Sequence, residues 1–553
     1  MAPTKTFFFL ITALFASSIL FAQTPGFEWQ LTWNSSQAVH CREIAIDSDG
    51  NIYVSGNFRA TVDLDPGAGV VNATSAVSYN GFLVKLTAQG AYLWSIAYPV
   101  ELWITDMQIS ALGDVLMGGS FRSPVDFDPG PGTVTLTNNG LSDGFLARYT
   151  SNGELLWAKS FGSVYNDGVR AINEAPNGEI IVAGDFVDAT DFDPGAGETI
   201  LISTGVSSTD GFFSRFDANG NFISVTPIGG VNSNDVSAAS VDIDGNIILV
   251  GRFSGSILFD PDGEAVEFTS EETDMFVAKY NSGGEFIWAK AVTGQNNLNV
   301  GSAEVDAQSN TYITGFFAGD GDFDPGDEEL LLTDPTLMGE LFIMKLDVDG
   351  NLVWAHQLGV PEAQEFGMEL SVDANQNLFL TGIVTGNVDF DLGPDVVNLP
   401  GSTLDAFVLV MNSNAEFVWA SRFGNNQDDF GQKIIPYADG SVYVCGHRFP
   451  SGDSPHSFGY LYKYSTSSLN SSSAHLQMFG IEIYPNPSEG IVKVTAKDEI
   501  KSISVFDIAG KELGRYTPSA THTNIDLSLF ETGVYLLQIT TGNMINAVRV
   551  LKE

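Results

Sequence analysis

Pairs of aspartates separated by one residue recur along the chain at intervals of about 65 residues. The pairs are Asp63 and Asp65, Asp126 and Asp128, Asp191 and Asp193, Asp322 and Asp324, and Asp389 and Asp391. In an extended segment, side chains two residues apart point to the same side, so each pair could share a hard cation. These residues are therefore candidate metal ligands. Ca²⁺ is the candidate cofactor, and the sequence makes no cofactor certain.

The same residues also suit a turn without metal. A Pro-Gly dipeptide follows most of the pairs and supplies the dihedral angles of a turn, which the second aspartate can cap. A further copy has Leu258 in place of the first aspartate, two residues before Asp260. This departure counts against a uniform metal site. The turn interpretation is favoured, and the calcium hypothesis stays open.

Other motifs for catalysis or metal binding are weak. The Asp-x-Asp-Gly-Asn strings that begin at Asp47, Asp242 and Asp347 lack the further oxygen ligands and the distal glutamate of a complete calcium loop. The six histidines show no metal-ligand spacing, and there is no Gly-x-Ser-x-Gly motif. A catalytic carboxylate pair should be unique, whereas these acids recur with the repeat. No catalytic or cofactor-binding residue is predicted.

Charge and hydropathy restrict the partners and the location. The 553 residues carry 24 Lys and Arg against 68 Asp and Glu, a net charge of −44. This field repels phosphate backbones, so no nucleic acid partner is expected. Lys5 followed by the apolar run 7–22 predicts a signal peptide over residues 1–22. No later stretch reaches the ~18 apolar residues of a membrane span.

One period of the repeat predicts four short strands. Within residues 164–224 these are 168–174, 179–186, 210–216 and a last strand that begins at residue 221. The segments are β-branched or aromatic, and Asn-Gly turns separate them, as in antiparallel hairpins. We therefore expect an all-β fold.

The phase of the repeat predicts a closed ring. The second strand ends in a Gly-x-aromatic motif or a weaker copy of it, at Gly56, Gly119, Gly184, Gly251, Gly315, Gly382 and Gly446. The fourth strand has one copy fewer, and residues 27–33 at the N-terminus carry its pattern. A seven-bladed β-propeller over residues 23–464, closed by the N-terminal strand, leaves no unpaired sheet edge. A solenoid or a string of sandwiches would not need this offset.

These repeats resemble the bacterial secreted β-propeller repeat proteins, on the evidence of segments 242–251, 274–280 and 284–290. The resemblance implies fold and export but carries no shared activity. In a propeller, the aspartate pairs should share one face with the acidic stretches at residues 166–167, 234–235 and 428–429. That face, around the central channel, is the candidate binding surface. Closure also brings Cys41 near Cys445, so a disulfide is one hypothesis and two buried thiols are the other.

The C-terminal part is a separate unit. A Ser-rich linker over residues 465–479 precedes a small β-sandwich over residues 480–553. This unit resembles the type A C-terminal sorting domain of the type IX secretion system. The residues that carry the resemblance are Pro485, Asn486, Pro487, Gly490, Asp507, Gly510, Gly533, Tyr535 and Lys552. The resemblance implies the type IX machinery as a partner, in a Bacteroidota-like bacterium, and secretion or display at the cell surface.

The sequence thus predicts a secreted or surface-anchored propeller that binds a glycan or protein ligand, as a monomer. The alternatives are an extracellular polysaccharide-active enzyme, either hydrolase or lyase, and a structural spacer without ligand. An enzyme should show one blade-specific departure from the repeat, with unique acids, His or Tyr at the channel mouth.

Overall fold

The protein is seen in a computed structural model that describes most of residues 26–552. The exceptions are 206–207, 261–262, 264, 360–363, 395, 402, 425–427, 450–455, 466–481, 485–487, 489, 507–510, 531–532 and 542–543. In this described part every regular element is a β-strand. None of it forms a helix long and apolar enough to cross a membrane. The predicted signal peptide lies outside the described residues, as does most of the predicted linker.

The basic unit is a group of four antiparallel strands, well illustrated by one group. It consists of β11 (Gly168–Glu174), β12 (Ile180–Val187), β15 (Thr209–Phe216) and β16 (Phe222–Val231), paired in that order. Tight turns at Gly178 and Gly220, with φ of 82° and 73°, join the strands in hairpins. The four predicted strands are therefore confirmed in this group.

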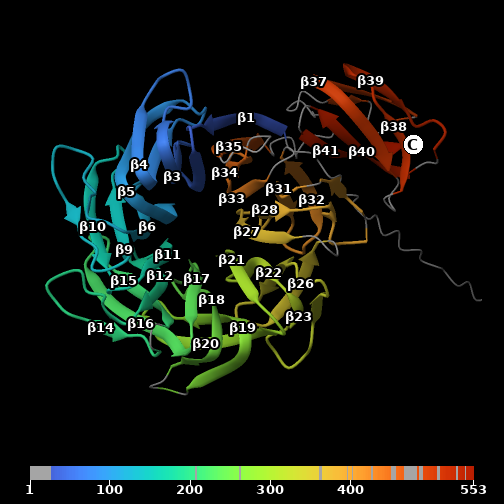
Figure 1. Ribbon diagram of the computed structural model, residues 1–553. Helices are drawn as coiled ribbons and strands as arrows, with labels where there is room; N and C mark the ends of the chain where they lie inside the picture. Colours follow the sequence, from blue (N-terminus) through green and yellow to red (C-terminus); the bar gives the residue numbers. More distant parts are fainter. Residues whose placement is uncertain are drawn as a thin grey trace, which may run out of the picture.

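The groups before and after it share this order and lie side by side around one centre (Figure 1). The two preceding groups are β2 (Ala38–Ile46), β3 (Ile52–Asp63), β4 (Asn72–Leu86) and the first part of β5 (Tyr92–Ile109), then the rest of β5, β6 (Val115–Phe121), β9 (Asp143–Tyr149) and β10 (Leu155–Phe161). The next two are β17 (Asn234–Val241), β18 (Ile247–Phe259), β19 (Val266–Tyr280) and β20 (Phe286–Gly294), then β21 (Leu298–Val305), β22 (Thr311–Phe317), β25 (Glu340–Leu346) and β26 (Leu352–Leu358). After these come β27 (Glu365–Val372), β28 (Leu378–Val384), β31 (Asp405–Met411) and β32 (Phe417–Phe423).

The last group combines both ends of the repeat region. It contains β33 (Asp429–Pro436), β34 (Ser441–Arg448) and β35 (Phe458–Ser465). Its fourth strand is the N-terminal strand β1 (Gly26–Trp33), which pairs antiparallel with β35 from Gly26↔Ser465 to Trp33↔Gly459. The sequence predicted that residues 27–33 supply the fourth strand of the last group, and the pairing of β1 with β35 agrees with this prediction.

Asp63 of the first aspartate pair ends β3, and short outer hairpins carry the other four pairs. They are β7 (Val125–Asp126) with β8 (Thr135–Leu136), β13 (Ala189–Asp191) with β14 (Ile200–Ile202), β23 (Gly319–Asp322) with β24 (Leu331–Asp334), and β29 (Asn387–Asp389) with β30 (Asn398–Pro400). The aromatic residue between the two aspartates packs inward. Phe192, for example, is fully buried, 4.6 Å from the ring of Phe212 and 5.2 Å from that of Phe161. The hairpins are thus fastened to the core.

A bulge at one position of every inner strand explains the recurring glycine. In β5, for example, Thr105 is the extra residue, because Ile104 pairs with Gly119 and Asp106 with Gly118. The bulge brings a backbone carbonyl against the glycine of the neighbouring strand: a Cβ on Gly119 would lie 1.8 Å from the oxygen of Trp103. No side chain fits there, which is why glycine recurs in the Gly-x-aromatic motif.

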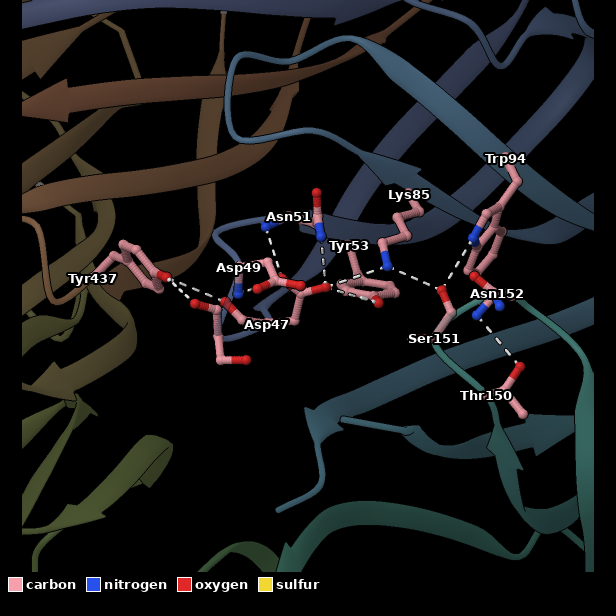
Figure 2. Close-up of polar contacts among 11 residues, drawn as sticks. Asp47, Asp49, Asn51, Tyr53, Lys85, Trp94, Thr150, Ser151, Asn152 and Tyr437 are labelled. Carbon is pink, nitrogen blue, oxygen red and sulfur yellow. Dashed lines mark hydrogen bonds and ion pairs between the residues drawn. The ribbon is translucent and has the colours of Figure 1, made fainter. Parts of the chain in front are cut away.

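Hairpin turns at the other end of the inner strands link neighbouring groups. In the turn after β2, Asn51 donates its backbone N–H (2.8 Å) and its side-chain amide (2.9 Å) to the Asp47 carboxylate. Lys85 lies 3.2 Å from the same carboxylate and donates to the carbonyl of Ser151 in the next group. From the last group, Tyr437 donates its hydroxyl to the carbonyl of Asp47 (Figure 2). This Asp-x-Asp-Gly-Asn string is therefore a turn.

The C-terminal unit has its own core and contacts the repeat region. Its strands are β36 (Glu482–Tyr484), β37 (Ile491–Phe506), β38 (Glu512–Tyr516), β39 (Ala520–Asp526), β40 (Gly533–Thr541) and β41 (Met544–Lys552). Val492, Ile503 and Leu537 are among the buried residues of its core. β41 pairs with β32 of the repeat region, and Gln538 donates to the carbonyl of Asn398 at 2.9 Å (Figure 1).

Candidate functional site

The aspartate pairs, the strongest candidates in the sequence, bind their own backbone. Asp126 accepts through Oδ1 the N–H groups of Asp128 (3.0 Å) and Val134 (2.8 Å), which lie at the two ends of the loop. Asp128 accepts the N–H of Gly130 at 2.7 Å. The first aspartate therefore closes the loop, and the second caps its Pro-Gly turn.

The other pairs repeat this geometry with the same partners. The first aspartates accept two N–H groups at 2.7–3.1 Å, and the second accept one at 2.8–2.9 Å, in the pairs Asp63/Asp65, Asp191/Asp193, Asp322/Asp324 and Asp389/Asp391. Within the described part of the chain, no three His, Cys, Asp or Glu side chains come together to hold a metal ion. The turn role of these residues is established, and calcium binding stays a prediction.

The structure differs from the disulfide hypothesis. Cys41 and Cys445 are free thiols, both fully buried in the apolar cluster between the first and last groups. Burial raises the pKa of both thiols. A thiol held away from water in its neutral form reacts slowly, because the thiolate is the reactive species.

The inner strands surround a central cavity of about 580 Å³. Its lining comes from β2, β5, β11, β17, β21, β27 and β33, so every group contributes to it. The residue that follows each bulge lines this cavity: Glu43, Asp106, Ala171, Ala238, Ser302, Glu369 and Lys433. The repeat therefore fixes the backbone here but leaves the side chain free to vary.

A lysine and four acids gather in this cavity. The Nζ of Lys433 lies 2.8 Å from Glu369 Oε1 and 3.3 Å from Glu43 Oε2. Asp106 accepts the backbone N–H groups of Met107 (2.8 Å) and Ile172 (2.6 Å), and Glu304 lines the same space. Three inner strands that are far apart in sequence are thus joined through one ammonium group.

Burial favours the neutral form of these acids. It raises the pKa of Glu43 to about 8 and that of Glu304 to about 7, and the pKa of Asp106 and Glu369 also rises. Burial alone would lower the pKa of Lys433. Glu369, Glu43 and Asp106 outweigh that effect and raise the pKa of Lys433 well above its ordinary value. Lys433 is therefore charged at neutral pH, and the four acids are not all ionised.

We call one end of the cavity the mouth. There, the residue two positions before the bulged residue of each inner strand pairs with the middle residue of the Gly-x-aromatic motif. The pairs are His40–Asn57, Trp103–Ser120, Gly168–Asp185, Asp235–Arg252, Asn299–Phe316, Phe366–Ile383 and Phe430–His447. These positions carry different residue types from group to group. The mouth is consequently asymmetric.

One side of the mouth is charged. Arg170, the bulged residue of β11, lies 2.5 Å from Asp185, and Arg252 lies 2.7 Å from Asp235. Arg252 also donates to Asn299 at 2.5 Å. The contact between Arg252 and Asn299 connects two neighbouring groups across the rim, and the two ion pairs lie within their own groups.

The other side is a row of rings. The ring centroids of Phe430 and His447 are 4.7 Å apart and nearly parallel, and those of His447 and His40 are 4.1 Å apart. Tyr79 lies 5.5 Å from His40, and Trp103 lies 5.5 Å from Tyr79. The row therefore runs from the last group across the first to the second.

The acidic stretches predicted for this face have mainly structural roles. Asp167 is buried and accepts the N–H groups of Ser163 (2.5 Å) and Val187 (2.9 Å), and Asp429 is buried beside Arg448 at 3.0 Å. Of these stretches, Asp235 contributes to the rim of the mouth. The sequence did contain a signal for the mouth: the middle residue of the Gly-x-aromatic motif varies between copies, although the glycine does not.

Of the predicted sorting residues, the structure describes four. Tyr535 is buried and lies 5.3 Å from the ring of Phe530, and Lys552 is buried where its strand bridges to Ser488. Gly490 has φ 150° and donates its N–H to Ser488, and Gly533 begins β40. Pro485, Asn486, Pro487, Asp507 and Gly510 lie outside the described residues.

Residues 482–553 match the family model of the secretion system C-terminal sorting domain. An uncharacterized WD repeat-containing protein of Acanthamoeba polyphaga mimivirus is 22% identical over 51% of this chain and 24% of its own length. The regulatory protein FlaEY of Caulobacter vibrioides is 24% identical over 45% of this chain and 26% of its own length. The chain thus spans about a quarter of the length of these curated relatives.

Solved structures with some likeness include the polysaccharide lyase Uly1, at 8% identity and a TM-score of 0.41, over 80% of this chain and 99% of that one. Another is PorZ of Porphyromonas gingivalis, described as a surface component of the type IX secretion system. It is 11% identical with a TM-score of 0.18, over 94% of this chain and 100% of that one. Likeness at this level does not transfer an activity.

Proposed function

This protein is secreted or displayed at the cell surface through the type IX secretion system, whose sorting domain it carries, and we propose that it binds a ligand at the asymmetric mouth of its central cavity. The proposal is based on which side chains vary from one four-stranded group to the next. Strands, bulges and motif glycines repeat in every group, and the aspartate pair recurs in five of them, whereas the side chains that line the cavity and its mouth vary. Repetition serves folding, so variation gathered at a concave surface favours recognition.

The scaffold inferred for this function is a closed seven-bladed propeller. Pairing of β1 with β35 supports closure. The position of Trp29 also supports closure. This residue of β1 packs against Gly90 of the first group, where an added Cβ would lie 3.6 Å from the Trp29 ring. In the same way Trp94 lies 3.3 Å from a Cβ on Gly153, one group further on. The contact between last and first groups therefore follows the pattern of contacts between consecutive groups.

Replacing Trp103 by alanine is expected to weaken ligand binding by about 30-fold, because a half-buried aromatic at a rim contributes most to such contacts. The full chain would be applied to arrays of glycans and surface proteins, and the variant tested on each ligand found. Leu112→Ala is the control, because Leu112 lies 78% exposed in the turn at the opposite end of β5.

Equal binding by the Trp103 variant would place the ligand elsewhere and contradict the proposal. Absence of any ligand would favour the structural spacer.

Action on extracellular polysaccharide is a second candidate, supported by one observation. His40, His447 and Tyr79 are unique to the junction between the last and first groups, the departure expected of an enzyme. Burial lowers the pKa of both histidines, to about 4 for His40, so both are neutral at pH 7 and disfavour taking up a proton unless a bound substrate changes their surroundings. Release of shortened chains from array-positive polysaccharides would favour this candidate over simple binding.

Calcium binding by the aspartate loops is a separate proposal, and the loop contacts set its test. Asp191→Ala should lower the free energy of unfolding by about 1–3 kcal/mol, because two backbone N–H groups lose their acceptor. Asp191→Asn keeps the accepting oxygen and should cost less than half as much. Thermal unfolding measures both. An unchanged midpoint of the native chain with Ca²⁺ or chelator would exclude a calcium contribution.

A further inference from the structure

The arginines of the repeat region point to an unassigned anion site. Residues 26–465 contain nine arginines. Seven of them lie within 3.1 Å of a carboxylate oxygen: Arg122, Arg148, Arg170, Arg215, Arg252, Arg422 and Arg448. Arg42 and Arg59 form no ion pair with any carboxylate in the described part of the chain. In a chain with 68 acids, two such arginines side by side need an explanation.

Both arginines belong to the first group and lie on the row of rings at the mouth. The guanidinium carbon of Arg42 is 4.9 Å from the centre of the Trp103 ring, and that of Arg59 is 5.2 Å from the centre of the Tyr79 ring. Arg42 is the bulged residue of β2 and lines the central cavity. Because Trp103 and Tyr79 are neighbours, the two cations share one platform.

The rings of Trp103 and Tyr79 lie against the guanidinium groups of Arg42 and Arg59. Arg42 donates Nε–H to Asn57 at 3.2 Å, its sole hydrogen bond to a described residue. A guanidinium stacked on a ring keeps its terminal N–H groups in a fixed fork that matches a planar oxyanion. Burial lowers the pKa of Arg42, since desolvation disfavours the charged form. An anion would remove that cost.

We propose that Arg42 and Arg59 bind the carboxylate or sulfate groups of an acidic saccharide, with the rings of Tyr79 and Trp103 beside the sugar. This rests on the proposed function and names its ligand class. Sugars pack their C–H faces on aromatic surfaces, and the half-buried rings of Tyr79 and Trp103 lie beside the two cations, whereas His447 is buried between Phe430 and His40. The net charge of −44 repels an acidic saccharide at low ionic strength, and at physiological ionic strength screening beyond about 8 Å makes the local charge of the two arginines the larger effect.

The experiment measures binding of four probes to the full chain by calorimetry: oligogalacturonate, sulfated dextran oligomers, neutral dextran oligomers and polyglutamate. We expect binding of one or both acidic saccharides, with the carboxylate and sulfate arms identifying the group recognised. Arg42→Gln and Arg59→Gln should each weaken it about tenfold, and the double variant should abolish it. Arg122→Gln is the control: it makes the same charge change at an arginine paired with Glu101 and 53% exposed.

Four results would overturn the inference. Two concern the saccharides: a folded native chain that binds neither acidic saccharide, and binding that survives in the double variant. The other two are an equal loss of binding in the Arg122 variant and tighter binding of polyglutamate than of the saccharides, which would assign the site to acidic peptides. If instead an array finds a neutral ligand that depends on Trp103, the mouth still binds a ligand and only the acidic class is wrong.

Discussion

Alanine in place of Gly119 is expected to lower the free energy of unfolding by about 3 kcal/mol or more. The added Cβ would lie 1.8 Å from the Trp103 carbonyl oxygen and 2.8 Å from its carbon. Because these are backbone atoms of the bulge in β5, no rotamer change can relieve the contact. The inner strand would have to separate from β6, which also disturbs the mouth.

Gly168→Ala is the matched control for this variant. Gly168 lies in the inner strand β11, and its nearest neighbour to an added Cβ is the Ser120 Cβ at 3.9 Å, an ordinary contact. Its effect on stability should stay within about 0.5 kcal/mol, since the change also reduces the freedom of the unfolded chain. Equal unfolding midpoints for the two variants, measured by thermal denaturation, would contradict the role assigned to the bulge.

The same contact recurs in all the groups. A Cβ on the motif glycine would lie 1.8–2.0 Å from the bulge carbonyl oxygen at Gly56, Gly119, Gly184, Gly251, Gly315, Gly382 and Gly446. The two weaker sequence copies, at Gly382 and Gly446, are as tightly restricted as the others. The glycine, more than the aromatic residue, is therefore the defining feature of the motif.

Lys433→Met is the second variant with a large expected effect. It removes the ammonium that contacts Glu43 and Glu369 and leaves those acids buried beside Asp106 and Glu304. Breaking a buried ion pair on one side costs about 3–5 kcal/mol. Thermal and urea unfolding at pH 8 should show this loss.

The loss should grow with pH. Glu43 and Glu304, with pKa values of about 8 and 7, bind protons in the folded state that they release in the unfolded state above about pH 4.3. Each therefore reduces stability as the pH rises through that window. Without Lys433 their ionisation is costlier still, so the difference between native chain and variant should be small at pH 5 and large at pH 8. Other titrating groups, His40 included, cancel in this difference.

A triple variant separates charge from packing. Glu43→Gln and Glu369→Gln, added to Lys433→Met, leave two uncharged amides where the ion pairs were. The triple variant should recover more than half of the free energy of unfolding that Lys433→Met loses at pH 8. The difference in stability between the native chain and the triple variant should also depend less on pH. If the triple variant is no more stable than Lys433→Met at pH 8, packing of the lysine stem, and not its charge, is what the cavity needs.

The sequence by itself determined the strands, their grouping in fours, the place of the N-terminal strand and the C-terminal sorting domain. Local chemistry suffices for these, because alternation, Asn-Gly turns and a repeating glycine depend on residues near one another in the chain. The recurring aspartates were recognised as turn residues for the same reason: their partners lie two and eight residues away, as with Asp126.

Only the tertiary structure decided where the distinctive chemistry lies. Lys433 meets Glu43 across the meeting point of the last and first groups, 390 residues apart in sequence. His40, Tyr79 and Trp103 form one row with His447 because strands from three groups (β2 and β4, β5, and β34) meet at one rim. Each of these residues looks like an ordinary variable position within its own repeat. Their proximity depends on which groups lie side by side, and residues within one repeat do not determine it. The aspartate loops that recur most clearly in the sequence close their own turns instead.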